Sequence, residues 1–506
     1  MHDYVIVGAG SAGCVLAARL TEDSSTSVLL LEAGPRDRKL EIRIPAAFSK
    51  LYKSEVDWGY STAPQAGLEG REIFFPRGKT LGGSSSISAM MVLRGHRGDY
   101  PWGPGWGWDA VEPYYRRSVE GPFPSAELLE PSPLTMAFVE AAVAAGLRHR
   151  ENLNDPDNEG VGLVPVSQRK GRRWSTADGY LRPALRRPSL TVATQAHVTR
   201  VLVEDGRAVG VDYRLGEREE EARAEREVIL CGGAINSPHL LLLSGIGPRH
   251  VLETAGIDVV HELPGVGRNL QDHLANGILA RTTGAKTLYT AESYRNLVRF
   301  LARRRGPLTS NVAEGAAFVR SRAELQGPDL ELVFAPVLYE EEGLVPPSED
   351  GITLAAVLLQ PRSFGTVQLR SADPFDPPVI DPRYLSDPED VRVLLHGVRL
   401  ARRVLAQEPL ARHVAGELQP GEEAQSDEEL EAHLRARSQT LYHPVGTCRL
   451  GTDELAVVDP ELRVRGLGRL RVVDASAIPW VPRGHTGWPT VMLAERAADL
   501  VRAGGR

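Results

Sequence analysis

The stretch that decides the fold opens the chain, where residues 2–32 read HDYVIVGAGSAGCVLAARLTEDSSTSVLLLE. Tyr4–Val7 is a short apolar run typical of a buried strand, and Ser11–Leu20 carries its apolar residues at helical spacing. Val28–Leu31 is a second apolar run, which ends at the acidic Glu32. The order of strand, glycine-rich turn, helix and strand predicts a parallel α/β unit.

The glycine turn at residues 8–13 (GAGSAG) has the spacing of a dinucleotide-binding fingerprint. The first glycine permits the tight turn, the second lets the backbone approach a pyrophosphate, and the third lets helix and strand pack closely. The helix N-terminus offers free N–H groups and a positive dipole end to that pyrophosphate. Glu32 follows the turn by about 20 residues, where a carboxylate accepts bonds from an adenosine ribose and disfavours NADP. The turn alone leaves FAD and NAD as alternatives.

Composition restricts the classes of function. The chain has 506 residues, 42% of them hydrophobic, and a formal net charge of −7. This length exceeds what one core organises, so we expect two domains, or one large α/β domain with a second layer. The charge provides no basic surface for nucleic acid and no attraction to a membrane. No apolar run reaches ~18 residues, so we expect no integral membrane segment. Because the first strand leaves no room for a signal peptide, we expect a cytoplasmic enzyme.

The three cysteines, Cys14, Cys231 and Cys448, show no CxxC spacing and are too few for a disulfide framework. We therefore expect buried thiols in a reducing compartment, and no metal site.

The rest of the chain contains two kinds of segment. The α/β pattern continues at Leu190–Val203, Ala208–Tyr213, Val228–Leu230, Pro238–Leu243, Leu470–Val473 and Pro489–Val501. Residues 275–430 instead mix alternating strands with amphipathic helices, at Leu330–Ala335, Ile352–Leu359, Thr366–Arg370, Asp390–Leu405 and Asp427–Arg437. The acidic cluster Glu217–Glu221 is expected to be a solvated hairpin turn, and the irregular residues 35–110 are expected to wrap a ligand.

Several longer motifs occur in a fixed order along the chain. They are residues 77–90 (RGKTLGGSSSISAM), 233–248 (GAINSPHLLLLSGIGP), 442–448 (YHPVGTC) and 472–476 (VVDAS). Together with the glycine turn, these motifs resemble the glucose-methanol-choline (GMC) family of flavin oxidoreductases. Their residues are most similar to those of its choline-dehydrogenase-like members. The resemblance implies an α/β fold, with a Rossmann-type FAD-binding domain and a substrate domain built on a mostly antiparallel sheet flanked by helices. It places the FAD-binding domain at 1–100, 185–270 and 444–506, and the substrate-binding domain at 101–184 and 271–443.

The resemblance also implies a cofactor and the residues that hold it. Ile87 stands where some family members have a histidine bonded covalently to the flavin, so we expect FAD to be bound without a covalent link. Ser88 replaces the asparagine usual in this loop. The residues expected to bind FAD are Gly8, Gly10, Ser11, Ala12, Gly13, Glu32, Ala33, Gly82, Gly83, Ser84, Ser88, Ala89, Met90, Val198, Gly232, Asp474, Ala475, His485, Thr486, Pro489 and Thr490.

The catalytic residues follow from two C-terminal motifs. His443 lies in the family's HxxGT motif and resembles its catalytic base, a role that suits a neutral imidazole. Residues 484–490 read GHTGWPT where the family form is Gly-Asn-Thr-Asn-Ala-Pro-Thr, so Gly487 stands at the second catalytic position and His485 at the first asparagine. Three interpretations stay open: His485 replaces the missing group, water fills its place beside His443, or the site has other chemistry or low activity.

The predicted function is FAD-dependent oxidation of an alcohol CH–OH group to the carbonyl, with hydride transfer to flavin N5 and a histidine base. The alternatives are a hydroxynitrile-lyase-like cleavage without net redox change, or an FAD-bound protein with little turnover. The expected partners are a small-molecule alcohol and an acceptor such as oxygen, a quinone or another carrier. Choline needs an aromatic cage with a carboxylate, for which Glu314, Tyr339 and Glu340–Glu342 are candidates. The sequence leaves open which alcohol is used, whether the enzyme is an oxidase or a dehydrogenase, and its oligomeric state.

Overall fold

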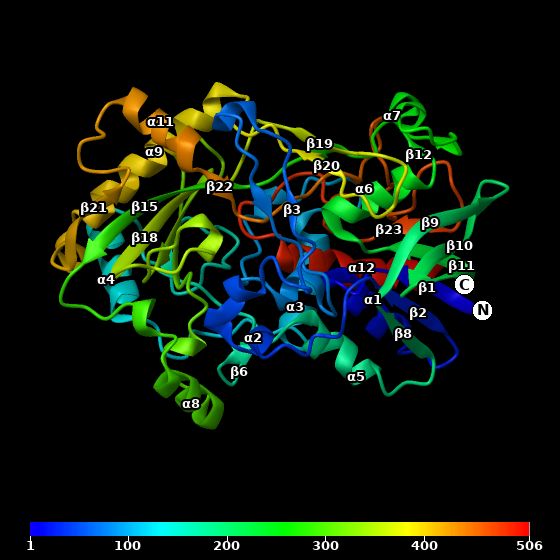
Figure 1. Cartoon of the computed structure of the whole chain (residues 1–506), viewed down its shortest axis with the longest axis horizontal. Coiled ribbons are helices and arrows are strands. Elements are labelled where there is room, and N and C mark those ends of the chain that lie inside the picture. Colours follow the sequence, from blue (N-terminus) through cyan, green and yellow to red (C-terminus); the bar gives the residue numbers. More distant parts are fainter. Residues whose placement is uncertain (505–506) are drawn as a thin grey trace.

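The computed structural model describes residues 1–504 and contains two seven-stranded sheets, which lie toward opposite ends of the molecule (Figure 1). The first sheet has the order β8-β2-β1-β11-β10-β9, with β23 also paired to β11. Its strands are β1 (His2–Val7), β2 (Val28–Glu32), β8 (Leu190–Thr194), β9 (Ala196–Glu204), β10 (Arg207–Leu215), β11 (Arg218–Leu230) and β23 (Leu470–Val472). The pairs β8–β2, β2–β1, β1–β11 and β11–β23 are parallel, and β9 and β10 extend this core as an antiparallel hairpin.

Two local predictions in this sheet need correction. The run Leu190–Val203 forms two strands, because Gln195 takes a left-handed φ of 61° and turns the chain between β8 and β9. The acidic cluster Glu217–Glu221 lies mostly in β11, and only Glu217 is in the turn, where Gly216 has a φ of 65°. Residues 219–221 pair with β10 while their carboxylates face solvent, so they do not mark a turn.

The second sheet is antiparallel throughout, in the order β21-β15-β18-β17-β16-β5, with β22 beside β15. Its strands are β5 (Gly160–Leu163), β15 (Leu274–Thr282), β16 (Gly315–Val319), β17 (Leu330–Ala335), β18 (Gly351–Leu358), β21 (Val414–Gln419) and β22 (Gln439–Thr440). The helices α4 (Pro133–Ala144), α9 (Pro388–Leu405) and α11 (Asp427–Arg437) pack on one face of it in a shared apolar core. The predicted combination of a Rossmann-type sheet and an antiparallel sheet flanked by helices is confirmed.

Short elements and loops connect the sheets. The remaining helices of at least six residues are α1 (Ser11–Leu20), α3 (Trp108–Val119), α6 (Gly233–Leu243), α7 (Arg249–Thr254), α8 (Tyr294–Arg303) and α12 (Gly487–Gly504). α12 begins two residues before Pro489, which therefore stands in the first turn as expected. Tyr100, Trp102 and Tyr115 pack into the core of the first sheet, although they lie at or beyond the predicted end of its first segment. The domain boundaries stay predictions.

Cys14, Cys231 and Cys448 are free and buried, as expected. Within residues 1–504, no helix combines the length and apolarity needed to cross a membrane.

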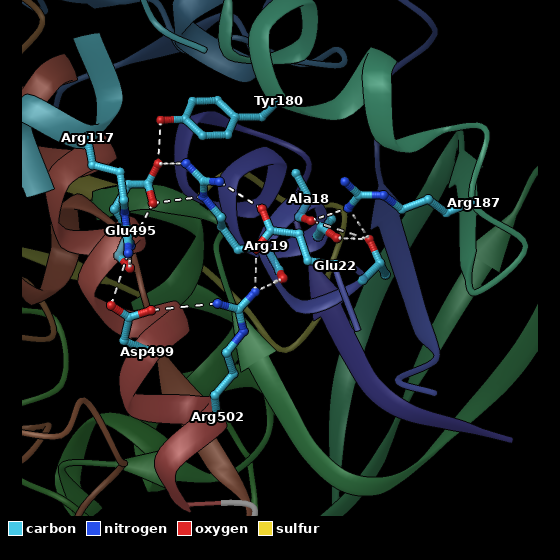
Figure 2. A network of polar contacts seen from close by, with 11 residues as sticks. Ala18, Arg19, Glu22, Arg117, Tyr180, Arg187, Glu495, Asp499 and Arg502 are labelled. Carbon is cyan, nitrogen blue, oxygen red and sulfur yellow. Dashed lines mark hydrogen bonds and ion pairs between the residues drawn. The ribbon is translucent and has the colours of Figure 1, made fainter. Parts of the chain in front are cut away.

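A buried carboxylate ties the last helix to the first (Figure 2). Glu495 on α12 is fully buried and accepts hydrogen bonds from Arg19 on α1, at 2.8 and 2.9 Å, and from the Tyr180 hydroxyl at 2.7 Å. Arg117 at the end of α3 forms a further ion pair with it at 2.8 Å. Paired this fully, the buried charge holds three helices together around one point.

We predict that Glu495→Gln lowers the free energy of unfolding by roughly 3–5 kcal/mol, because two half-buried arginines lose the buried carboxylate that they share. Glu22→Gln is the matched control, since Glu22 pairs with Arg19 and Arg502 at the surface and is worth about 0–1 kcal/mol. Urea and thermal unfolding of the purified proteins measure both. Equal midpoints for the two variants would contradict the role given to Glu495.

Candidate active site

One large cavity, of about 910 Å³, runs from the glycine turn to the second sheet. Most of the residues predicted to bind FAD line it: Gly8, Gly10, Ser11, Ala12, Glu32, Ala33, Gly83, Ser84, Ser88, Ala89, Met90, Val198, Gly232, Asp474, Ala475, His485, Thr486 and Thr490. Gly13, Gly82 and Pro489 lie behind its wall. Ile87 and His443 also line the cavity. Segments far apart in the sequence therefore meet around one space.

The three glycines of the turn differ in what constrains them. Gly8 has a φ of 100°, and a Cβ there would lie 2.5 Å from the carbonyl oxygen of Cys231. A Cβ on Gly13 would lie 1.9 Å from the Gly8 carbonyl oxygen, so this glycine closes the helix onto the strand. Around Gly10, a Cβ would meet no protein atom closer than 3.9 Å, and it would enter the cavity. Because Gly10 has no side chain, it leaves space in the cavity at this point, which fits a pyrophosphate there.

A second glycine loop lies against the first. Gly82 has a φ of 87° and Gly83 a φ of 51°, and a Cβ on Gly83 would lie 2.7 Å from the Cα of Gly10. Arg173, fully buried, donates hydrogen bonds to the carbonyl oxygens of Ser88 and Ile42 and fixes the far end of this loop. The two glycine loops together form a cradle of backbone groups around the cavity.

Glu32 lies at the end of β2, on the cavity wall. Its carboxylate accepts hydrogen bonds from the backbone N–H groups of Ala9 and Gly34, both at 2.9 Å. Burial raises the pKa of Glu32 to about 7. The carboxyl group is therefore positioned by the turn itself, beside the place expected for a ribose.

At the other end of the cavity, three histidines and one glutamate form a continuous chain. The Nδ1 atoms of His273 and His443 are 3.0 Å apart, and the rings of His443 and His485 have centroids 4.4 Å apart. Nε2 of His485 lies 3.2 Å from the carboxylate of Glu331, which is fully buried on β17. His443 and His485, predicted separately from two motifs, are thus brought together.

The hydrogen bonds of His273 determine the tautomer of His443. Burial lowers the pKa of His273 to about 3, so this ring is neutral. Its Nε2 faces the Leu359 carbonyl oxygen at 3.2 Å and must donate, which leaves its Nδ1 as an acceptor. His443 then donates from Nδ1, and its Nε2 carries the free lone pair. Burial, with the neighbouring His485, His273 and Arg77, lowers the pKa of His443 well below 6.5.

Asp272 fixes the backbone of His443. Its buried carboxylate accepts hydrogen bonds from the His443 N–H at 2.7 Å and from the hydroxyls of Tyr384 and Thr440. Burial raises the pKa of Asp272 to about 6, and these hydrogen bonds act against that rise. Asp272 and His273 are adjacent in the sequence, so one short segment positions both the backbone and the ring of His443.

Sequence reasoning missed His273 and Glu331 as site residues. His273 ends the segment 267–273 (GRNLQDH), which also resembles the GMC family, and this resemblance is the signal in the sequence that points to it. Glu331 gave no usable signal, because an acid alternating with leucines in a strand normally indicates a solvent-exposed face. Here that face of β17 looks into the cavity.

Other residues singled out from the sequence lie differently from what was expected. Glu314 lies outside the cavity, where its carboxylate accepts hydrogen bonds from Ser310, Thr135 and the Ser132 N–H, so it cannot serve a choline cage. Trp488, next to Gly487, donates from its indole to Ser118 at 2.8 Å and packs against Tyr115, so it belongs to the core of the first sheet. A Cβ on Gly487 would meet no atom within 4 Å.

The fold and the cavity define the class as a Rossmann-type flavin oxidoreductase. Two sequence models described as GMC oxidoreductase match residues 2–275 and 361–494, and the chain belongs to this family. It is 43% identical to an alcohol dehydrogenase [acceptor] of Pseudomonas putida, over 99% of this chain and 96% of that protein. It is 42% identical to mitochondrial choline dehydrogenase of Homo sapiens, over 99% and 90%.

Among solved structures, a variant of Aspergillus oryzae formate oxidase, studied for its FAD modification, superposes with a TM-score of 0.93. It is 28% identical and covers 99% of this chain and 98% of its own. The predicted membership of the GMC family is confirmed, and so is the predicted similarity to choline dehydrogenase. The protein is an enzyme that acts on CH–OH donors, and these similarities support FAD as its cofactor.

We predict that Gly10→Ala folds but binds FAD about tenfold more weakly or worse, because its methyl group enters only the cavity. Gly13→Ala is the control, whose methyl group would overlap the Gly8 carbonyl and prevent correct folding. Flavin absorbance per chain and circular dichroism separate the two effects. A yellow, fully loaded Gly10→Ala protein would contradict a pyrophosphate at this turn.

Proposed function

We propose that this chain oxidises an alcohol to its carbonyl, with His443 as the base and FAD held without a covalent bond. The observation that carries the proposal is the lone pair on His443 Nε2, fixed by the hydrogen bonds of His273 at one end of the cavity. When bound, FAD accepts the hydride at its N5 atom. His443 takes the hydroxyl proton, a role that a neutral imidazole can fill in a buried site.

The cradle for FAD is formed by the two glycine loops, with Glu32 at the ribose and Asp474 and Ala475 beside the start of α6. Ile87 offers no nucleophile for a covalent bond, which supports non-covalent binding. All strands of the first sheet fall within 1–100, 185–270 and 444–506, and those of the second within 101–184 and 271–443. This supports the proposed division into a cofactor domain and a substrate domain.

His485 is proposed to take the place of the side chain missing at Gly487. The Glu331 carboxylate accepts a hydrogen bond from Nε2 of His485 and so orients its ring beside His443. The negative charge of Glu331, two groups from His443, offsets part of the unfavourable effect of His485 on a protonated His443. This arrangement favours the His485 interpretation over a water acting with His443 alone. Relatives named for dehydrogenation favour oxidation over the lyase alternative.

We predict that His443→Ala lowers kcat/KM for alcohols by about 10²–10⁴-fold and that His485→Ala lowers it by less. Because the base works when neutral and burial lowers its pKa, wild-type kcat/KM should fall only as the pH drops below 6.5. Anaerobic mixing of holoenzyme with an alcohol panel measures flavin bleaching directly.

Full turnover by His443→Ala would reject the base assignment. An unchanged chemical step in His485→Ala would reject the replacement of the missing side chain. If no alcohol bleached the wild-type flavin, the low-turnover alternative would stand instead.

The cavity wall beyond the histidines indicates the kind of alcohol. Three antiparallel strands present alternate residues to it in rows, Gly277–Ala355–Val333 and then Leu279–Thr353–Ala335. These side chains are small, and Gly277 and Ala355 are the residues of the inner strands that the cavity leaves partly exposed. The Thr353 hydroxyl already donates to the Val337 carbonyl oxygen. The wall is an apolar floor without a free polar group.

The floor favours a neutral alcohol with an apolar body over choline. From Ala275 to Leu279 it extends about 13 Å from the histidines, at ~3.3 Å per strand residue. At the outer rim, Glu342 has its pKa raised to about 7 by burial, and Arg71 lies near enough to compete for it. A quaternary ammonium would have to compete with Arg71 for Glu342, although Glu340 and Glu341 also line the cavity there. The acceptor, whether oxygen, a quinone or another carrier, and the cytoplasmic location remain part of the proposal.

We predict that kcat/KM rises along the series ethanol, hexanol, decanol, because each added methylene is buried on the floor. Ala355→Leu should lower kcat/KM for decanol by about 10–100-fold and leave ethanol nearly unchanged. Val333→Ala, which widens the same row, is the matched control and should retain the wild-type kcat/KM for decanol. If choline were oxidised faster than every apolar alcohol, the assignment of this floor would be wrong.

A further inference from the structure

The helix α8 (Tyr294–Arg303) stands out from the body of the molecule (Figure 1). One side of it is well packed: Leu297 and Phe300 contact Ile44, Ala47 and Leu308 in a small apolar cluster. A hydrogen bond from Asn296 to the Ala291 carbonyl and the Ser293 cap fix its first turn. α8 is therefore a formed helix with one face on the protein and the opposite face in solvent.

The side of α8 next to its packed face is apolar and exposed. Tyr294, Val298 and Leu301 are exposed to 82%, 44% and 47%, and their spacing of four and three residues aligns them in one stripe. Together they form what we term the outer stripe. Three large apolar side chains in line on one projecting helix are unusual for a surface that meets only water.

Arginines lie on one side of the outer stripe and at the end of the helix. Residues 294–305 contain five arginines and no acidic residue, in a chain whose net charge is −7. Arg295, Arg299 and Arg303 follow one flank of the helix, and Arg304 and Arg305 follow its end. Arg299 and Arg305 pair with Glu130, whereas Arg295 and Arg303 form no ion pair within residues 1–504. The nearest acid at the N-terminal end, Glu292, pairs with Lys50.

We propose that α8 docks this enzyme onto an anionic membrane surface. An amphipathic helix with a basic flank and an aromatic residue lies in the headgroup region, with its apolar stripe in the acyl boundary. Such docking needs no membrane-spanning segment, and it rests on the local charge of residues 294–305, whereas the expectation of no attraction to a membrane rested on the net charge of the whole chain. The basic flank decides between occupants: a purely apolar partner would not need it, and anionic headgroups match it in charge.

The position of α8 gives this docking a consequence. Its packed face lies on the segment Pro45–Leu51, and Phe48 of that segment lines the active-site cavity. Docking through the outer stripe therefore places on the lipid surface the helix that supports this part of the cavity wall. An apolar alcohol dissolved in the membrane would then have a short path to the enzyme. The docking itself does not depend on the proposed function.

Flotation of the yellow holoenzyme with vesicles tests the proposal. With phosphatidylcholine vesicles containing phosphatidylglycerol, wild-type enzyme should float at low salt, and binding should weaken as salt screens the arginines. Tyr294→Ser/Val298→Ser/Leu301→Ser should weaken binding by about a hundredfold. Arg295→Gln/Arg303→Gln should weaken it about tenfold or more, on anionic vesicles only.

The matched control is Leu185→Ser/Val260→Ser/Leu455→Ser, which removes three similarly exposed apolar side chains elsewhere and should float like wild type. All variants should keep the wild-type circular dichroism spectrum and the wild-type ratio of bound flavin to chain, which shows that they are folded. The proposal is overturned if wild-type enzyme ignores anionic vesicles, or if the outer-stripe variant floats equally well. It is also overturned if that variant only dissociates a dimer, seen by gel filtration, because the partner would then be a second copy.

Discussion

The buried Glu495 carboxylate is the interaction on which the arrangement of the site depends. It joins α12 to α1 through Arg19 and to α3 through Arg117 (Figure 2). α1 starts at the glycine turn, and α12 starts at Gly487, two residues after His485. The two ends of the cavity are therefore built on helices that share one charge. Because an unpaired buried charge is costly, the three partners leave these helices little freedom to shift.

The fold was largely predictable because its signals are local. The helix Ser11–Leu20 and the strand Leu330–Ala335 were predicted with the bounds that the structure has. Their apolar periodicities are strong, and each is bounded by glycine or by a polar turn. The errors occurred where one backbone angle decides, as at Gln195, which splits a continuous apolar run into two strands. Such a left-handed residue leaves no trace in hydrophobic periodicity.

The site was predictable only where a motif carried it. His443 and His485 were predicted because they lie in family motifs, and the structure places the centroids of their rings 4.4 Å apart. Glu331 could not be found, because its role exists only through contact with a residue more than 150 positions away. The same holds for the apolar floor: Gly277 and Ala355 are neighbours through sheet register, which the sequence does not specify. For this chain, the register between strands that are far apart in the sequence could not be predicted from the sequence.

The proton chemistry follows from the balance of charge in the buried chain of four groups. Three imidazoles lie next to one another with one carboxylate, so they cannot all be charged. His273 stays neutral because it is fully buried and no acid faces it, and it gives its lone pair to His443. Glu331 lies at the opposite end of this chain of four groups, separated from His273 by His443 and His485. A proton taken at Nε2 of His443 therefore charges a ring whose Nδ1 is bound by a neutral acceptor, while the balancing carboxylate of Glu331 lies beyond His485.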